Sequence, residues 1–262
     1  MESIGTGLAA VETDGHRADI YLDRPEKRNA VTMALASDLT AAFERIDDDE
    51  SIRAITLLGE GPVFCAGMDL ETMRARADPD SAVEWARFPE LLGTIEAVRQ
   101  PVVAGIEGAA PAGAFELTLA CDFRLLGADA DYGVIEVKLG TFPHAGGTQR
   151  LPRLVGLSKA KEIVLTGEYV PPEEALECGL VHEVCDPGTV DERAKAFADE
   201  LCANAPLGMA RAKRSLNAAL ETPKAQGLAL EESLGRGLDD TRDYREGIEA
   251  RLEGRKPEFE GR

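Results

Sequence analysis

The sequence predicts an α/β protein with a helical C-terminal part. Strand-like and helix-like segments alternate from the N-terminus to about residue 185. From about Asp191 onward only helical patterns remain, with breaks at Pro206 and Pro223. Such alternation is typical of a sheet covered by helices. The length of 262 residues allows one or two domains and a sizeable buried core.

The predicted strands are recognised by their apolar patterns. Residues 16–23, HRADIYLD, alternate between polar and apolar side chains, as a half-buried strand does. Residues 52–59 and 101–108 are short, largely apolar runs, which indicate buried strands. Two shorter strands are expected at 122–127 and 180–184.

The predicted helices are recognised by an apolar face and by their end residues. Thr32 is placed to cap a helix that runs to about Asp48, and residues 81–99 form a second amphipathic helix with Val83 in its apolar set. Residues 113–121, GAFELTLAC, predict a short buried helix. Three further helices are expected within 140–156, 157–166 and 170–179.

The charge of the chain restricts its partners. Asp and Glu number 48 against 29 Lys and Arg, which gives a formal net charge of −19. Such a charge repels phosphate backbones and anionic lipid headgroups, so the sequence predicts neither a nucleic-acid nor a membrane partner. Excess acid with scarce Lys favours adaptation to strong salt, which screens self-repulsion. The alternative is an acidic protein from a GC-rich genome.

Cysteine and histidine usage predicts a cytoplasmic protein without a metal centre. The N-terminal segment carries acid where a signal peptide needs positive charge. The five Cys are an odd number without a CxxC pair, as expected of free thiols in a reducing compartment. Cys178, His182 and Cys185 have the wrong spacing for a zinc knuckle, and the three His are scattered along the chain.

Two loop-to-helix junctions are candidate ligand sites. Residues 64–70, FCAGMDL, and residues 108–117, GAAPAGAFEL, each follow a buried strand and open a helix. Small residues there would let a ligand approach free backbone N–H groups at the positive end of a helix. Two such junctions side by side would make an oxyanion hole. On this pattern alone, tight packing is the more common explanation.

Two glutamates stand in apolar surroundings. Glu116 lies three residues after Gly113, about one helical turn on, and Glu136 sits in YGVIEVKLG. A lone buried carboxylate is costly, whereas two carboxylates around one water can perform acid and base catalysis together. Taken without further information, two unrelated glutamates that are each satisfied locally are the better explanation.

Five ordered segments resemble the crotonase superfamily, the enoyl-CoA hydratase/isomerase group. These segments are RPEKRNAVT at 24–32, PVFCAGMDL at 62–70, PVVAGIEGAAPAGAFELTLACDFRLLG at 101–127, YGVIEVKLGTFPHAGGTQRLPRLVG at 132–156 and LTGEYVPPEEALECGLVHEV at 165–184. The resemblance runs from about Ala18 to Phe259. It implies a crotonase-type spiral of ββα units over 1–195, with the active site and CoA site. It also implies a helical region at 196–262 that forms a homotrimer or homohexamer.

The resemblance also assigns roles by position. Backbone N–H groups of Met68 and Gly113 would form the oxyanion hole. Glu116 and Glu136 match the two glutamates of the hydratases, which lie twenty residues apart (136 − 116 = 20). The implied reaction adds water across the 2,3 double bond of a 2-enoyl-CoA to give a 3-hydroxyacyl-CoA, without a cofactor. Ionised Glu116 would take a proton from water, and protonated Glu136 would donate one to C2.

The resemblance further implies residues that bind CoA, and some family positions are changed. The implied CoA-binding residues are Lys27, Arg28, Ala66, Asp69, Leu70 and Lys256, the last in its own or a neighbouring subunit. Family members often have three glycines where this chain has Ala112, Gly113 and Ala114. These changes bear on the acyl chain that is accepted more than on the reaction type.

Two alternatives to a hydratase remain at this stage. One is another acyl-CoA reaction on the same scaffold, such as double-bond isomerisation or dehydration of a specialised hydroxyacyl-CoA. An isomerase needs only one base, so the presence of both glutamates argues against it. The other is a non-catalytic CoA- or RNA-binding member, which the acidic charge and the intact glutamate pair disfavour.

Overall fold

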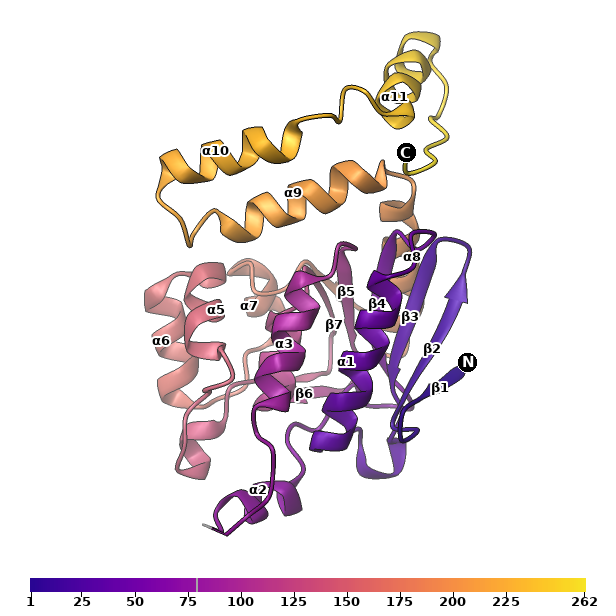
Figure 1. Ribbon diagram of the computed structural model, residues 1–262. Coiled ribbons are helices and arrows are strands. Elements are labelled where there is room, and N and C mark those ends of the chain that lie inside the picture. The colour runs from indigo at the N-terminus through magenta and orange to yellow at the C-terminus, as the bar shows by residue number, and fades with distance from the viewer. Residues whose placement is uncertain (79) are drawn as a thin grey trace.

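A computed structural model, which describes residues 1–78 and 80–262, shows a central sheet with helices on both faces (Figure 1). The first three strands are antiparallel neighbours, and β3 to β9 pair in parallel. In spatial order this sheet comprises β1 (Glu2–Ile4), β2 (Ala9–Asp14), β3 (Arg17–Leu22), β4 (Ala54–Gly59), β5 (Val102–Ile106), β7 (Phe123–Gly127) and β9 (Glu183–Cys185). A small parallel pair, β6 (Ala109–Pro111) and β8 (Asp131–Gly133), stands apart from it.

The α/β prediction is confirmed, and the apolar runs are the reason. Every residue of β3, β4 and β5 is buried, because helices cover the sheet on both sides. The sequence patterns missed β1, β2, β6 and β8. Three of these four strands have only three residues, which is too short for a periodicity to be recognised.

Two helices cover one face of the sheet and a third covers the other. α1 (Met33–Asp47) packs against α3 (Arg87–Ala97) on one face, and α8 (Val190–Cys202) contacts β3, β4, β5 and β7 on the other. Thr32 caps α1 as predicted, accepting a hydrogen bond from Leu35 N at 3.1 Å. The other helices are α2 (Leu70–Arg76), α4 (Gly113–Leu119), α5 (Gly147–Val155), α6 (Leu157–Thr166), α7 (Pro172–Glu177), α9 (Pro206–Ala218), α10 (Lys224–Gly235) and α11 (Arg242–Glu253), with 3-10 turns η1 (Pro25–Lys27) and η2 (Glu136–Leu139).

The predicted helix over 81–99 is wrong at its start. The helix α3 begins only at Arg87, and Val83 lies in the preceding loop. Pro89 accounts for the difference, because proline has no N–H to donate and is tolerated only in the first turn of a helix. A helix that began at residue 81 would have Pro89 in its interior.

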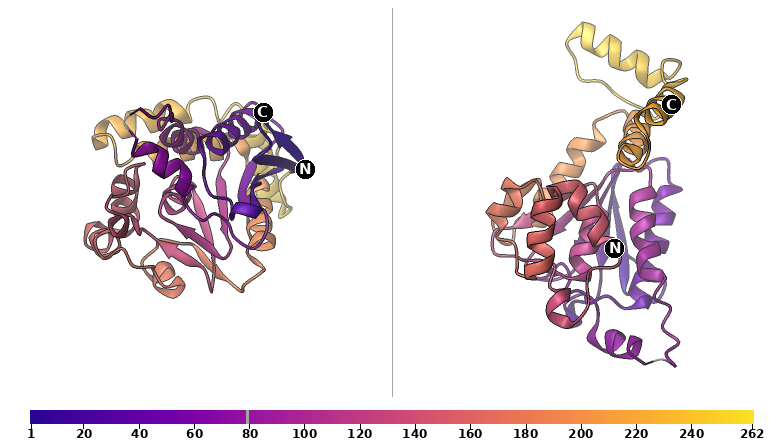
Figure 2. Two further views of the ribbon diagram at one scale, coloured as in Figure 1. Left: turned by 90° about the horizontal axis from the view of Figure 1, so that it is seen from below. Right: turned by 90° about the vertical axis from the view of Figure 1, so that its left-hand side faces the viewer.

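The C-terminal helices α9, α10 and α11 form an arm above the sheet and its covering helices (Figures 1 and 2). Within the arm, neither α9 nor α10 contains a buried residue. Lys213 of α9 attaches the arm to the body through an ion pair with Asp122 at 2.7 Å and a hydrogen bond to Gln100 O at 2.9 Å. The arm therefore exposes apolar side chains, among them Leu216, Leu220, Leu228, Ile248 and Leu252.

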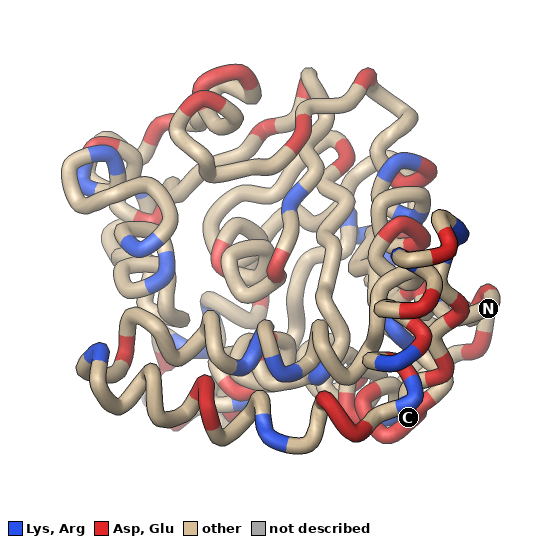
Figure 3. The backbone as a smooth tube through the Cα atoms, turned by 90° about the horizontal axis from the view of Figure 1, so that it is seen from above, with Lys and Arg blue, Asp and Glu red and all other residues tan. Residues whose placement is uncertain are grey.

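Charge is distributed unevenly over the molecule. Figure 3 shows the acidic residues mainly on helices and loops around the rim, whereas the strands at the centre carry few charges. None of the helices within residues 1–78 and 80–262 is long and apolar enough to cross a membrane.

Candidate active site

The two small-residue junctions lie against each other. Gly67 has a φ of +91°, and a Cβ added there would come within 2.9 Å of the carbonyl oxygen of Pro111. A Cβ on Gly113 would come within 2.9 Å of Cγ of Met68. Glycine is required at Gly67, because its φ is left-handed and the neighbouring atom is backbone, whereas a larger residue at Gly113 would displace the Met68 side chain.

Each junction presents a backbone N–H that no other part of the described chain uses. Around Met68, Val31 N donates to Gly67 O at 2.8 Å and Asp69 N donates to Val31 O at 2.9 Å, so the Met68 N–H points away from this pairing. Gly113 is the first residue of α4, where N–H groups have no partner within the helix. Among residues 1–78 and 80–262, no acceptor is found for either N–H. The structure thus brings the two predicted donors onto adjacent loops, and their role as an oxyanion hole stays a prediction.

Ala112 makes the turn between β6 and α4 in a strained conformation. Its φ of +52° and ψ of −121° lie in a region that residues with a Cβ rarely adopt. The turn is held by a hydrogen bond from Ala112 N to Gly133 O at 2.9 Å. It directs the chain into α4 with Gly113 at the start and Glu116 one turn on.

Glu116 is a buried carboxylate that two backbone N–H groups hold. Its exposed fraction is 4%, and its Oε1 accepts hydrogen bonds from Ala145 N at 2.9 Å and Gly147 N at 2.8 Å. Burial raises the pKa of Glu116, and these two donors together with the charge of Arg150 oppose the rise. The donors stabilise the ionised form of this residue.

Glu136 is the contrasting member of the pair. It opens η2 with an exposed fraction of 6%, and neither carboxyl oxygen has a hydrogen-bond partner within the described chain. Burial raises the pKa of Glu136 to about 7, and the neighbouring charge of Glu116 adds to the rise. Glu136 therefore keeps its proton to higher pH than an ordinary carboxyl group, as expected for a buried carboxyl beside a second one.

The backbone of the loop before α5 was not predicted as part of the site; from the sequence, only His144 of this loop could be a third polar group there, and a partly exposed side chain is the more common case for such a histidine. Ala145 and Gly147, which bind Glu116, belong to PHAGGT, a segment in which the sequence analysis singled out no backbone donor. A Cβ on Gly147 would come within 2.9 Å of Oε1 of Glu116. The two consecutive glycines ahead of a helix were the available signal. His144 is exposed, with its Nδ1 2.8 Å from Phe142 O, and its proximity slightly lowers the pKa of Glu136.

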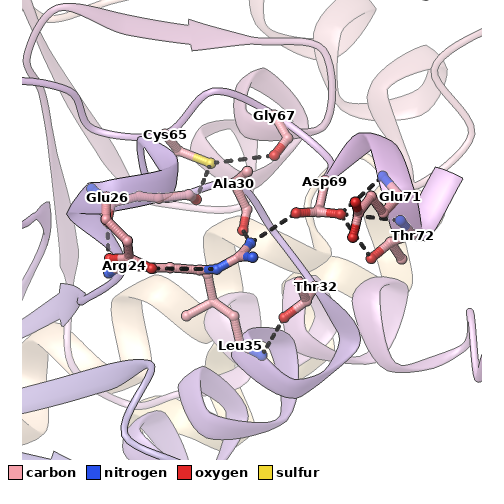
Figure 4. Close-up of polar contacts among 11 residues, drawn as sticks. Arg24, Glu26, Ala30, Thr32, Leu35, Cys65, Gly67, Asp69, Glu71 and Thr72 are labelled. Carbon is pink, nitrogen blue, oxygen red and sulfur yellow. Dashed lines mark hydrogen bonds and ion pairs between the residues drawn. The ribbon is translucent and has the colours of Figure 1, made fainter.

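Among the predicted CoA-binding residues, Asp69 has a structural role (Figure 4). Its carboxylate caps α2, accepting from Glu71 N at 3.0 Å and Thr72 N at 3.1 Å, and pairs with Arg24 at 2.9 Å. Burial raises the pKa of Asp69, but Arg24 and the two N–H donors outweigh it, so the pKa lies below its usual value. These contacts leave the Asp69 carboxylate engaged within the protein.

The remaining predicted CoA residues fall into two places. Lys27 and Arg28 are exposed in the turn of η1, and Ala66 N donates to Arg28 O at 2.9 Å, which joins this turn to the first junction. Leu70, 77% exposed, begins α2 beside them. Lys256 follows α11, at the opposite end of the molecule from α2 (Figure 1). Within one chain the structure does not bring Lys256 to this cluster.

Asn29 organises the same turn and was missed by the sequence analysis. It is fully buried with a φ of +55°. Its Nδ2 donates to Glu60 O at 2.9 Å and Val63 O at 2.8 Å, and its Oδ1 accepts from Arg24 N at 2.9 Å. Asn is one of the few residues that combine a left-handed backbone with local hydrogen bonding. Its place in the polar turn RPEKRNA was the only available signal.

Comparison with known proteins identifies the family. The sequence profile of the family described as enoyl-CoA hydratase/isomerase matches residues 13–262. The chain belongs to this family. It is 36% identical over 240 residues to the mitochondrial enoyl-CoA hydratase of Pongo abelii, covering 92% of this chain and 82% of that protein. It is 37% identical over 243 residues to the 2,3-dehydroadipyl-CoA hydratase of Escherichia coli (strain K12), covering 93% and 94% respectively.

Solved structures of the family have the same fold. The enoyl-CoA hydratase of Bacillus anthracis superposes with a TM-score of 0.92 at 33% identity, covering 97% of this chain and all of that chain. An enoyl-CoA hydratase of Mycobacterium tuberculosis superposes with a TM-score of 0.88 at 32% identity. The crotonase-type fold and the assignment to the crotonase superfamily are therefore confirmed.

Proposed function

We propose that this chain is a hydratase that adds water reversibly across the 2,3 double bond of a 2-enoyl-CoA. The observation that carries the proposal is the pair of buried glutamates with opposite surroundings, next to two free backbone donors. The identity to family hydratases supports it. An isomerase would need one base, and here both carboxyl groups occupy the same buried site.

The proposed oxyanion hole stabilises charge as it develops. The N–H groups of Met68 and Gly113 would donate to the thioester oxygen of the substrate. As the attack on C3 shifts negative charge onto that oxygen, both hydrogen bonds strengthen, which lowers the barrier. One donor of this kind contributes about 3–4 kcal/mol in general. The reaction needs no cofactor in this scheme.

The glutamate pair would handle the protons. A water between the carboxyl groups would give a proton to ionised Glu116 as its oxygen bonds to C3, and protonated Glu136 would give its proton to C2. Afterwards Glu116 is neutral and Glu136 ionised, and transfer of one proton between them restores the starting state. Two N–H groups donate to Glu116, and no donor to Glu136 is found in the described chain; this difference supports the division of roles.

The CoA site is proposed around the turn of η1. Lys27 and Arg28 would face the phosphates, with the backbone of Ala66 and Leu70 near the adenine. Asp69 would contribute indirectly, by capping α2 and holding Arg24. Lys256 would have to approach the CoA of a neighbouring subunit, because α11 lies far from this turn.

The C-terminal region, predicted at 196–262, would serve for oligomerisation and the rest as the spiral core. Because α8 packs on the sheet as far as Cys202, we place the start of the oligomerisation region after this helix. The exposed leucines of the arm fit a homotrimer or homohexamer, because exposed apolar surface of this kind commonly marks an interface. A cytoplasmic enzyme that works in strong salt would fit the net charge of −19. If activity on crotonyl-CoA peaks at low salt, the salt-adapted interpretation is wrong.

The test of the function is loss of the conjugated thioester absorbance of crotonyl-CoA in high salt. We expect the absorbance to fall at a rate proportional to enzyme concentration, with 3-hydroxybutyryl-CoA as product. A 3-enoyl-CoA, supplied separately, tests isomerisation. Binding of crotonyl-CoA without loss of absorbance would overturn the hydratase proposal, and conversion of the 3-enoyl-CoA alone would favour an isomerase.

A further inference from the structure

The loop that holds Glu116 is itself held by one side chain of α5. Arg150 donates from Nη1 to Ala145 O at 2.9 Å. Its Nε and Nη2 donate to Oε1 and Oε2 of Glu96 in α3, both at 2.7 Å. The guanidinium thus joins α3 to the peptide whose neighbouring N–H binds Glu116.

Arg150 also packs on the residue between the two donors. Gly146 has a φ of +110°, and a Cβ on it would overlap Nη1 of Arg150. Ala145 and Gly147, on either side of Gly146, are the two residues whose N–H groups bind Glu116. A glycine that is both left-handed and in contact with the guanidinium leaves the loop few other conformations.

The contact between Arg150 and Glu96 is suited to fixing a position. A planar guanidinium that uses two N–H groups on one carboxylate has a defined direction as well as attraction. The Arg150 side chain is only 19% exposed, so solvent screens this pair less than a pair at the open surface. The same charge opposes the rise of the pKa of Glu116.

We propose that Arg150, oriented by Glu96, is a positioning residue that holds the loop 145–147 against Glu116 and keeps this carboxylate ionised. The inference rests on the proposed function, in which Glu116 is the base. Arg150 itself would touch neither the substrate nor the water that attacks C3. Its effect reaches the reaction through the Ala145 peptide and through its charge.

Other charged groups near Glu116 also affect its pKa, so they bear on the pH dependence of the reaction. Glu136 of η2 is the second carboxyl of the pair, and His144 lies in the loop before α5. Glu96 partly neutralises Arg150 from α3. Removing Arg150 therefore raises the pKa of Glu116, whereas removing the charge of Glu96 lowers it, because the positive charge is then less compensated.

The experiment compares Arg150→Gln, Arg150→Lys and Glu96→Gln by the pH dependence of crotonyl-CoA hydration. We expect Arg150→Gln to lower kcat about 10- to 100-fold with little change in KM, since small displacements of a catalytic group cost this much. Its acid limb should move to higher pH. Arg150→Lys keeps the charge but not the paired hydrogen bonds, so kcat should fall while the acid limb stays near that of the unmodified chain.

Glu96→Gln tests the same contact from α3, and it provides the measurement if Arg150→Gln does not fold. It should lower kcat and move the acid limb to lower pH. Arg153→Gln is the matched control: Arg153 lies on the same helix and donates only to Gln149 O of that helix within the described chain. Its kcat and pH profile should not change.

The possible outcomes distinguish failure of the role proposed for Arg150 from failure of the proposed hydratase function. Wild-type kcat and acid limb in Arg150→Gln would overturn the inference. A fall in kcat with an unmoved acid limb would also overturn it, because it would show a merely structural role. If the unmodified chain does not hydrate crotonyl-CoA, or Glu116→Gln keeps its full rate, the proposed function fails instead.

Discussion

Replacing Glu136 by Gln removes a carboxyl group whose ionisation opposes folding. Burial and the charge of Glu116 raise its pKa from 4.5 to about 7 in the folded chain. A pKa difference of about 2.5 units, at about 1.36 kcal/mol each, changes the free energy of unfolding by about 3.4 kcal/mol. Because the folded-state pKa is the higher one, protonation of Glu136 stabilises the folded chain relative to the unfolded one. This contribution is fully present below pH 4.5 and is lost as the pH rises through about 7.

The assay is urea unfolding of both proteins between pH 4.5 and 8.5 in constant salt and at one protein concentration. Trp85, the only tryptophan, provides the fluorescence signal. The free energy of unfolding of Glu136→Gln, minus that of the unmodified chain, should be up to about 3 kcal/mol higher at pH 8.5 than at pH 4.5. Because the measured quantity is a change with pH, any constant effect of the amide cancels.

A matched control uses an exposed carboxylate. Glu44 lies on the exposed side of α1, where Glu44→Gln should produce no comparable change with pH. The reasoning is refuted if the stability difference for Glu136→Gln is the same at both pH values. In that case Glu136 would be ionised without penalty, and its role as the acid would lose its physical basis.

Three further predictions concern catalysis and the loops around the site. The kcat for hydration should fall as the pH rises through about 7, where Glu136 loses its proton; a profile flat from pH 6 to 9 would contradict this. Ala112→Gly should raise the free energy of unfolding by about 1 kcal/mol, since it relieves a strained φ of +52° at a smaller entropic cost; a destabilised variant in urea titration would argue against strain. Asp69→Ala should lower stability by about 1–2 kcal/mol by removing the cap of α2, whereas the exposed Asp14→Ala should have little effect; equal losses would contradict this.

Local patterns of the sequence were sufficient to predict most strands and helices of the fold. The apolar runs at 52–59 and 101–108 contain β4 and β5, because buried parallel strands need apolar side chains on both faces. Thr32 marks the start of α1 because its hydroxyl accepts a backbone hydrogen bond. Pro89 could also have placed the start of α3, had its lack of an N–H been weighed against the apolar periodicity.

The site could be predicted only in part, because its residues were recognised by their resemblance to a family and their surroundings come from distant contacts. Glu116 and Glu136 were recognised by family spacing, whereas their opposite surroundings come from contacts with a distant loop. Ala145 and Gly147 contribute backbone atoms, which leave no side-chain signature in the sequence. Lys256 was included because of the family resemblance alone, and no local pattern showed that α11 would lie far from the turn of η1.

The proposed roles of Glu116 and Glu136 are tested most directly by the rate of crotonyl-CoA hydration. The rate is measured for Glu116→Gln, Glu136→Gln and the double variant, together with binding of acyl-CoA. We expect each single variant to lose kcat by orders of magnitude while acyl-CoA still binds. We also expect the double variant to lose little more, because the two carboxyl groups act as one unit. A single variant near the wild-type rate would contradict the account.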